Sequence, residues 1–188
     1  EMTKNEYLAI IYPDDRADII KNIEQCIDDA KEYNVDHRIV NKRGKIRWFN
    51  TKGTLVRDNQ GSAVTMLGVS IDITERKLIE EKLHLSSRVF RDTHEGIIIT
   101  DVNRHIVDVN PAFCRITGYS HEEVIGRTPA FLNSGKQSDS FYKDMWLQLN
   151  KFGHWQGEIW NCKKNGELYA ELLTISVLTD DNDVTFYL

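Results

Sequence analysis

The stretch Asn41-Lys-Arg-Gly-Lys-Ile-Arg-Trp48 decides the fold, because it is echoed in the second half of the chain by Lys163-Lys-Asn-Gly-Glu-Leu-Tyr169. In each copy a charged turn with Gly joins two strand-like runs, which predicts a β-hairpin, since Gly and Asn adopt positive φ at little cost. The turns Asp58-Asn-Gln-Gly61 and Asp180-Asp-Asn182 then lead into a third run. We therefore predict a three-stranded antiparallel meander at the end of each copy and the duplication of a whole domain.

The residues between the two copies, 74–90, read TERKLIEEKLHLSSRVF and contain neither Gly nor Pro. Strong helix formers and apolar residues at helical spacing predict a single helix here, with Asp72 as its N-cap and Glu75 at the capping-box position. The apolar stripe of this helix needs a partner, which is either the flanking domain or the same helix of a second subunit. A packed connector and a dimerising helix that transmits a signal are both open at this point.

The second copy can be followed from its first strand, predicted over Gly96–Asp101 and followed by a second strand over Ile106–Val109. Asn110-Pro111 predicts the start of a short helix, with Asn as N-cap and Pro in the first turn. A further short helix and a longer one over Asp139–Phe152 come next, and three strands follow Gly153. This order predicts an α+β domain in which a curved antiparallel five-stranded sheet carries helices on one face.

Composition excludes several classes of function. The 188 residues carry 24 Lys+Arg against 29 Asp+Glu, a net charge of −5, so the chain is a poor partner for nucleic-acid phosphates. Its apolar runs are too short to span a bilayer. The 3 Cys and 6 His are scattered, without disulfide-framework or metal-ligand spacing, which favours free thiols in a reducing cytoplasm. No nucleophile-elbow or phosphate-loop motif is present, and we expect no enzyme active site in this stretch.

Several segments of the sequence resemble PAS domains, including the PAC-type half that ends each copy. They are Tyr12–Arg16, His37–Gly44, Ile46–Trp48 and Gly68–Lys77 in the first copy, and Gly96–Asp101, Val109–Tyr119 and Glu122–Arg127 in the second. The resemblance covers nearly the whole chain. It implies a first PAS domain at residues 1–73, present in its C-terminal portion only, a helical linker at 74–90 and a second PAS domain at 91–188 that lacks its end. We therefore expect the native chain to extend further.

The resemblance also implies a cofactor pocket in the second copy. The string Gly126-Arg-Thr-Pro-Ala-Phe-Leu-Asn133 is similar to the flavin-adduct motif of light-oxygen-voltage domains, but Pro129 stands where those domains have the adduct-forming Cys. A cysteinyl adduct is therefore excluded. Asn161 matches one of the two amide side chains that bond the flavin ring in those domains, and Glu171 replaces the other. A protonated carboxyl can also donate and accept at the ring edge, and burial raises the pKa of such a carboxyl.

The strings Phe141–Trp146 and His154–Gly157 extend the resemblance to the FAD-binding PAS domains of bacterial redox sensors for nitrogen fixation and methane oxidation. We therefore predict FAD as the cofactor. The predicted cofactor contacts are Phe131, Trp146, Trp155, Asn161 and Glu171. A purely structural role in the core is the alternative for the tryptophans. Haem is disfavoured, because residues 139–152 contain no His to serve as an axial ligand, and no metal ligands are predicted.

The resulting hypothesis is a cytoplasmic, non-catalytic sensory input module of a bacterial signalling protein. It senses redox state or a small ligand through a PAS-bound flavin and relays the change through helical linkers of a homodimer. The resemblance implies a downstream output domain, either a histidine kinase or a cyclic-di-GMP enzyme. The alternative is a ligand-free PAS scaffold that serves dimerisation and relay.

Overall fold

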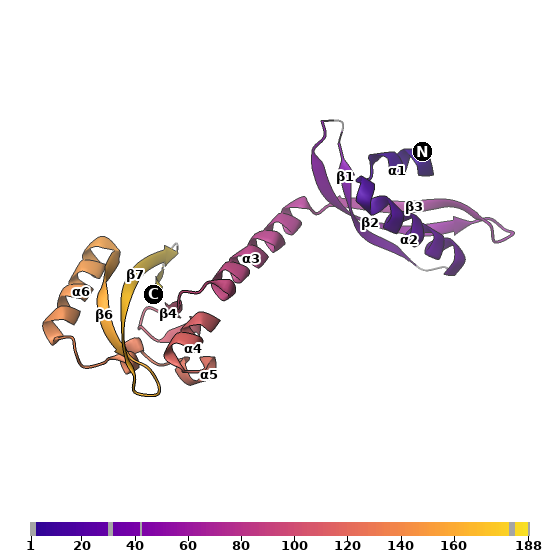
Figure 1. Cartoon of the computed structure of the whole chain (residues 1–188). Coiled ribbons are helices and arrows are strands. Elements are labelled where there is room, and N and C mark those ends of the chain that lie inside the picture. The colour runs from indigo at the N-terminus through magenta and orange to yellow at the C-terminus, as the bar shows by residue number, and fades with distance from the viewer. Residues whose placement is uncertain (1–2, 30–31, 42, 181–182, 188) are drawn as a thin grey trace. The chain divides into compact units, whose positions relative to one another are not determined.

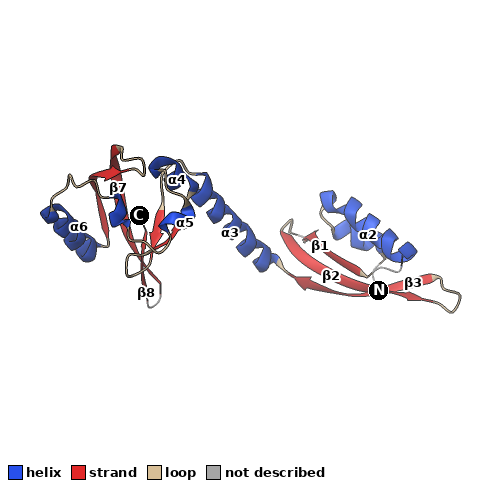
Figure 2. Ribbon diagram, turned by 90° about the horizontal axis from the view of Figure 1, so that it is seen from below, coloured by secondary structure: helices blue, strands red, loops and turns tan. Residues whose placement is uncertain are grey.

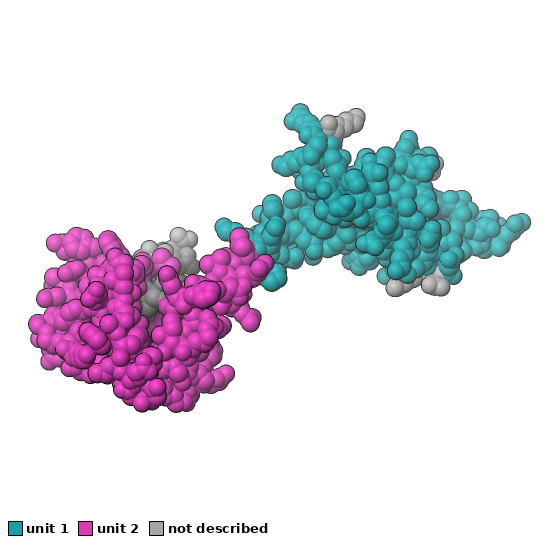
Figure 3. Space-filling model, viewed as in Figure 1, with its two compact units in different colours: residues 1–84 teal, residues 85–188 magenta. Residues whose placement is uncertain are grey.

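The computed structural model describes residues 3–29, 32–41, 43–180 and 183–187. The chain divides into two compact units, Glu1–His84 and Leu85–Leu188 (Figure 3). Both units combine helices with an antiparallel sheet, which confirms the predicted α+β class. The boundary falls within helix α3 (Thr74–Asp92), which begins at the predicted residue and continues to Asp92 instead of Phe90. Because the helix begins at Thr74, Ile73 and not the predicted Asp72 holds the N-cap position, although the Asp72 carboxylate accepts a hydrogen bond from the Thr74 N–H at 2.9 Å.

The first unit is a three-stranded sheet preceded by helices. Its elements in chain order are α1 (Lys4–Ile10), the 3-10 turn η1 (Pro13–Asp15), α2 (Arg16–Asp29), β1 (Tyr33–Val40), β2 (Ile46–Arg57) and β3 (Ala63–Asp72). The strands pair antiparallel in the order β1-β2-β3, as the meander predicts, and α2 lies along the sheet (Figure 2). Ile19 and Cys26 of α2 pack with Ile11 and Tyr33 in a buried cluster. Our sequence prediction did not include α2.

The second unit contains the remaining elements. They are β4 (Ile98–Thr100), β5 (Ile106–Val109), α4 (Pro111–Thr117), α5 (His121–Val124), η2 (Pro129–Leu132), α6 (Asp139–Phe152), β6 (His154–Cys162), β7 (Leu168–Asp180) and β8 (Asp183–Tyr187). All five strands form one antiparallel sheet in the order β5-β4-β8-β7-β6. Strand β4 is shorter than predicted, because the Ile97 N–H bonds the Asn110 side chain and Asp101 already belongs to the following turn.

The two hairpin turns of the sequence repeat are equivalent in the structure. Between β1 and β2 the Gly44 N–H donates to the Asn41 carbonyl at 2.9 Å, and between β6 and β7 the Gly166 N–H donates to the Lys163 carbonyl at 2.9 Å. The two glycines have φ values of 75° and 87°, a region that strains residues with a Cβ. The local rule that predicted the hairpins therefore holds in both copies.

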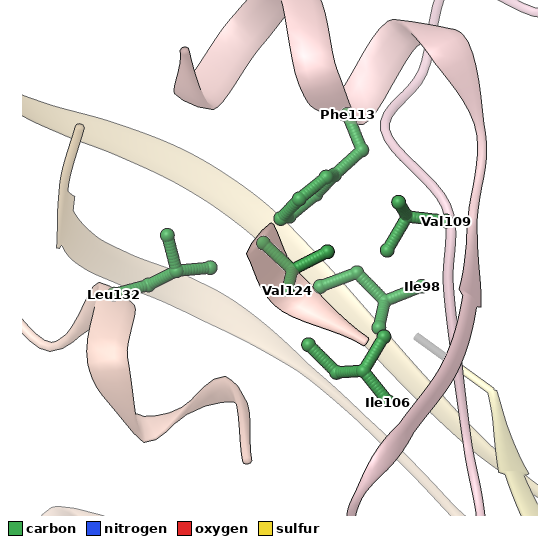
Figure 4. Packing of buried hydrophobic residues seen from close by; sticks show 6 residues of the cluster. All are labelled: Ile98, Ile106, Val109, Phe113, Val124 and Leu132. Atoms are coloured by element: carbon green, nitrogen blue, oxygen red, sulfur yellow. The ribbon is translucent and has the colours of Figure 1, made fainter. Parts of the chain in front are cut away.

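Two apolar clusters form the core of the second unit. The first brings together side chains from β4, β5, α4, α5 and η2, which point toward one another in Figure 4: Ile98, Ile106, Val109, Phe113, Val124 and Leu132. The second joins Met145 and Leu149 of α6 to Trp155 of β6 and Ile175 of β7, and Figure 1 shows α6 beside β6. As predicted, Asn110 caps α4 and accepts from the Phe113 N–H.

Apolar side chains of α3 are exposed along most of its length. Leu78, Ile79, Leu83, Leu85 and Val89 have exposed fractions of 60 to 72%. Four residues of β3 are exposed in the same way: Val64, Leu67, Val69 and Ile71. Within the described ranges, none of the helices has the length and apolar character that crossing a membrane requires.

Candidate functional site

A cavity of about 520 Å³ lies within the second unit and is bounded by members of both core clusters. The sheet contributes residues of β4, β6 and β7, while η2, α6 and the β4–β5 turn supply the rest of the lining. Its apolar residues include Ile98, Leu132, Met145, Ile159 and Leu173. Proteins bind small molecules in mainly apolar pockets of about 300–1,000 Å³ with a few polar groups, so this cavity has the size and lining of a ligand site.

Two neighbouring strands place Asn161 and Glu171 in the cavity wall. Alternate residues of a strand face the same side, so Asn161 faces the cavity together with Ile159 of β6, as does Glu171 together with Leu173 of β7. The Asn161 Nδ2 donates a hydrogen bond to the Glu171 Oε1 at 2.7 Å. Asn161 is 6% exposed and Glu171 is half-buried, so this bond joins a buried amide to a partly buried carboxyl group.

Burial is the main influence on the pKa values of Glu171 and its neighbour Tyr169. It raises the pKa of Glu171, although hydrogen bonds from Asn161 and Tyr169 act in the opposite direction. Burial, reinforced by the nearby Glu171 charge, also raises the pKa of Tyr169. In both cases a low-polarity environment penalises the charged form of the side chain. A neutral carboxyl beside an amide can donate to and accept from a polar ligand edge.

Arg104 and Trp146 lie together on another side of the cavity. The guanidinium carbon of Arg104 is 4.9 Å from the centroid of the Trp146 ring, within the range of a cation–π contact. Arg104 has a φ of 67°, uncommon for a residue with a side chain. The Asp101 carboxylate holds this turn by accepting from the N–H groups of Asn103 and His105 at 2.9 and 2.8 Å.

The predicted cofactor contacts divide into two groups. Trp146, Asn161 and Glu171 line the cavity together, whereas Trp155 and Phe131 are not among the described lining residues. The ring of Trp155 packs edge-on against Phe141 at 5.8 Å between centroids. It also covers Gly157 so closely that a Cβ there would lie 2.6 Å from the indole. Trp155 thus occupies the core position that was its alternative.

Phe131 likewise packs against other side chains and is not among the described lining residues of the cavity. Its ring meets Tyr119 edge-on at 4.8 Å between centroids, and the Arg127 guanidinium lies 4.2 Å from its centroid. Sequence reasoning also missed Arg104 and Tyr142, which the structure places in the lining. Tyr142 lies within the string Phe141–Trp146 but is not a predicted contact, and no motif marks Arg104, because the β4–β5 turn meets α6 only in the folded unit.

The described lining can also be compared with what a cysteinyl adduct, a haem ligand or a metal site would require. Pro129 lines the cavity at the position of the adduct-forming Cys of light-oxygen-voltage domains, and neither Cys114 nor Cys162 belongs to the described lining. The described lining also contains no His. Across the part of the chain that the structure describes, no group of three His, Cys, Asp or Glu side chains is placed to hold a metal ion.

Comparison with known proteins identifies the family. A model described as PAS domain matches residues 94–188, and one described as PAS fold matches residues 1–70. The chain belongs to the PAS family. A solved PAS domain from Colwellia psychrerythraea shares the fold with a TM-score of 0.52 and 21% identity, over 56% of this chain and 91% of that one.

Two curated relatives are similar in sequence. The nitrogen fixation regulatory protein of Klebsiella oxytoca is 34% identical over 94 residues, which cover 50% of this chain and 19% of that protein. The blue-light photoreceptor of Listeria innocua is 34% identical over 95 residues, 49% of this chain and 38% of that protein. The family and these relatives define a PAS sensor module of signalling proteins. The chain spans a minor part of each relative's length.

Proposed function

We propose that the chain is a cytoplasmic sensory input module that binds FAD in the cavity of the second unit. The observation that carries the proposal is the apolar cavity of about 520 Å³ with Asn161 and Glu171 joined in its wall. These two residues stand where light-oxygen-voltage domains have their pair of flavin-bonding amides. Similarity to a nitrogen fixation regulatory protein and a blue-light photoreceptor is consistent with this role.

The donor set fits the polar edge of a flavin ring. The Asn161 amide offers both donor and acceptor atoms, and the Glu171 carboxylate can accept from the ring N–H. The apolar residues of the lining suit the hydrocarbon part of the ring, and Trp146 adds an aromatic face. When bound, a flavin supplies hydride and electron-transfer chemistry. A ligand edge that reaches Asn161 competes with Glu171 for the amide, so the pair can respond to the state of the ligand.

Contacts between sheets and α3 support a relay through this helix. In the first unit the Trp48 N–H donates to the Thr74 Oγ1 at 2.9 Å, and Asp36 of β1 pairs with Lys77 at 3.1 Å. In the second unit the Asn110 Nδ2 donates to the Phe90 carbonyl at 3.0 Å. Both ends of the helix are thus bonded to sheet-forming segments. A ligand that binds two arrangements of a sheet with different affinity would bias the helix.

The exposed apolar side chains of α3 support homodimerisation through this helix. The three cysteines are free thiols, which suits a reducing compartment. The matched segment covers 19% of the length of the nitrogen fixation regulatory protein. The proposed output domain, a histidine kinase or a cyclic-di-GMP enzyme, would lie outside the given sequence.

Binding of FAD to the full chain tests the proposal. We expect the protein to keep a visible flavin spectrum after unbound FAD has been removed by gel filtration, and to release the flavin on denaturation. Asn161→Ala and Glu171→Ala should each weaken binding about tenfold, since each removes a hydrogen bond to a buried polar group. Glu158→Ala, an exposed residue on the opposite face of β6, is the matched control and should leave binding unchanged.

A protein that takes up no flavin would overturn the proposal. In that case the ligand-free dimerisation and relay scaffold becomes the better description. The Asn161–Glu171 hydrogen bond is the observation that favours this alternative, because it satisfies both side chains without a ligand.

A further inference from the structure

We propose that Arg104 forms an anion subsite at the mouth of the cavity and selects flavins that carry a phosphate ester over riboflavin. The inference rests on the proposed flavin function and adds a determinant of ligand choice. FMN and FAD share the phosphate ester on the ribityl chain, and riboflavin ends there in a neutral hydroxyl.

The position of Arg104 is the first reason. Arg104 and Trp146 line the main cavity and also a second hollow of about 290 Å³, whose other lining residues are Val102 and Asn150. Val102, Arg104 and Asn150 are exposed, and Trp146 is half-buried. A ring system held in the main cavity can therefore extend a tail past Arg104 and Trp146 toward solvent.

The charge of Arg104 is the second reason. Among residues 43–178, whose side chains the structure describes, no carboxylate forms an ion pair with its guanidinium, which lies 4.9 Å from the centroid of the Trp146 ring. The nearest acidic residue along the turn, Asp101, is engaged by the N–H groups of Asn103 and His105 and lies 3.5 Å from the His105 Nδ1. A cation–π contact leaves the guanidinium N–H groups that point away from the ring available to an anion.

The backbone of the turn is the third reason. Arg104 has a φ of 67°, and its N–H donates to the Asp101 carbonyl at 2.9 Å. A turn held by these bonds presents the Arg104 side chain from a defined backbone position beside the cavity. Arginine matches phosphate oxygens with two parallel N–H donors, and such charge-assisted bonds are stronger than neutral ones.

Titration of the full chain with riboflavin, FMN and FAD, followed by flavin fluorescence, tests the subsite. We expect FMN and FAD to bind about tenfold more tightly than riboflavin. Arg104→Gln should weaken the binding of FMN and FAD more than that of riboflavin and so remove the preference, while Arg104→Lys should retain part of it. The preference should also shrink at about 1 M salt, where the screening length is about 3 Å. Arg115→Gln, at an exposed arginine of α4, is the matched control.

The outcomes separate the subsite from the flavin site itself. Equal affinity of the wild-type chain for all three flavins overturns the subsite and leaves the proposed flavin function standing. Equal weakening of all three by Arg104→Gln also overturns it, because Arg104 would then act only as a structural partner of Trp146. An Arg104-dependent preference for FMN alone supports a subsite for a phosphate monoester, and one for FMN and FAD supports the shared ester. Binding of no flavin overturns the proposed function, and the subsite with it.

Discussion

Asn110 joins three segments of the second unit, and its replacement by Ala should destabilise that unit strongly. The side chain is fully buried, at 0% exposure. Its Nδ2 donates to the carbonyls of Phe90 and Glu95 at 3.0 and 2.9 Å, and its Oδ1 accepts from the N–H groups of Ile97 and Phe113, both at 2.9 Å. Asn110→Ala therefore leaves four backbone groups without this partner.

The magnitude follows from those bonds. Loss of the N-cap of α4 costs about 1 kcal/mol. Each buried backbone group left unpaired costs about 1–3 kcal/mol, and a water molecule that fills the space of the deleted side chain offsets part of that cost. We expect the free energy of unfolding of the second unit to fall by about 3–4 kcal/mol, which is a large share of a typical stability of about 5–15 kcal/mol. Asn110→Ser keeps a capping oxygen and should recover about 1 kcal/mol.

Urea unfolding of the full chain, followed by tryptophan fluorescence, provides the measurement. Trp146, Trp155 and Trp160 lie in the second unit and Trp48 in the first, so the second unit dominates the signal. The transition of the first unit should not move, and Asn59→Ala, at an exposed turn residue, is the control. A loss below about 1 kcal/mol, or equal losses for Ala and Ser, would refute the reasoning, because the cap and the unpaired groups would then contribute little.

Two further variants test the core and the helix. Gly157→Ala places a Cβ 2.6 Å from the Trp155 indole and should cost about 1–3 kcal/mol and change the near-ultraviolet circular dichroism, so an unchanged spectrum would contradict the packing described. Leu83→Glu puts a charge on the exposed apolar stripe of α3 and should shift sedimentation equilibrium from dimer to monomer, and an unchanged dimer would exclude this stripe as the interface.

Local sequence rules predicted much of the fold because their causes are local. The short helix after Asn110-Pro111 begins with the predicted cap, and Gly118 ends it with a φ of 79°. The hairpins at Gly44 and Gly166 form because only a few residues decide a tight turn. The sequence order of strands and helices in the second unit follows from the same signals.

The candidate site was only partly predictable. Strand alternation places Trp155 and Asn161 on the same face of β6, but does not tell which of them reaches the cavity. The choice depends on Gly157, whose missing side chain lets the Trp155 ring fold over the strand. The position of Phe131 depends likewise on Tyr119, which follows α4.

The sequence by itself determined the order of elements in the second unit, the turns at Gly44 and Gly166 and the cap at Asn110, because each depends on residues near one another in the chain. Only the tertiary structure decided that β8 lies between β4 and β7, and that the β4–β5 turn brings Arg104 to Trp146 of α6. These contacts join segments far apart in sequence. Their formation depends on how complete surfaces pack together, which no short pattern of residues encodes.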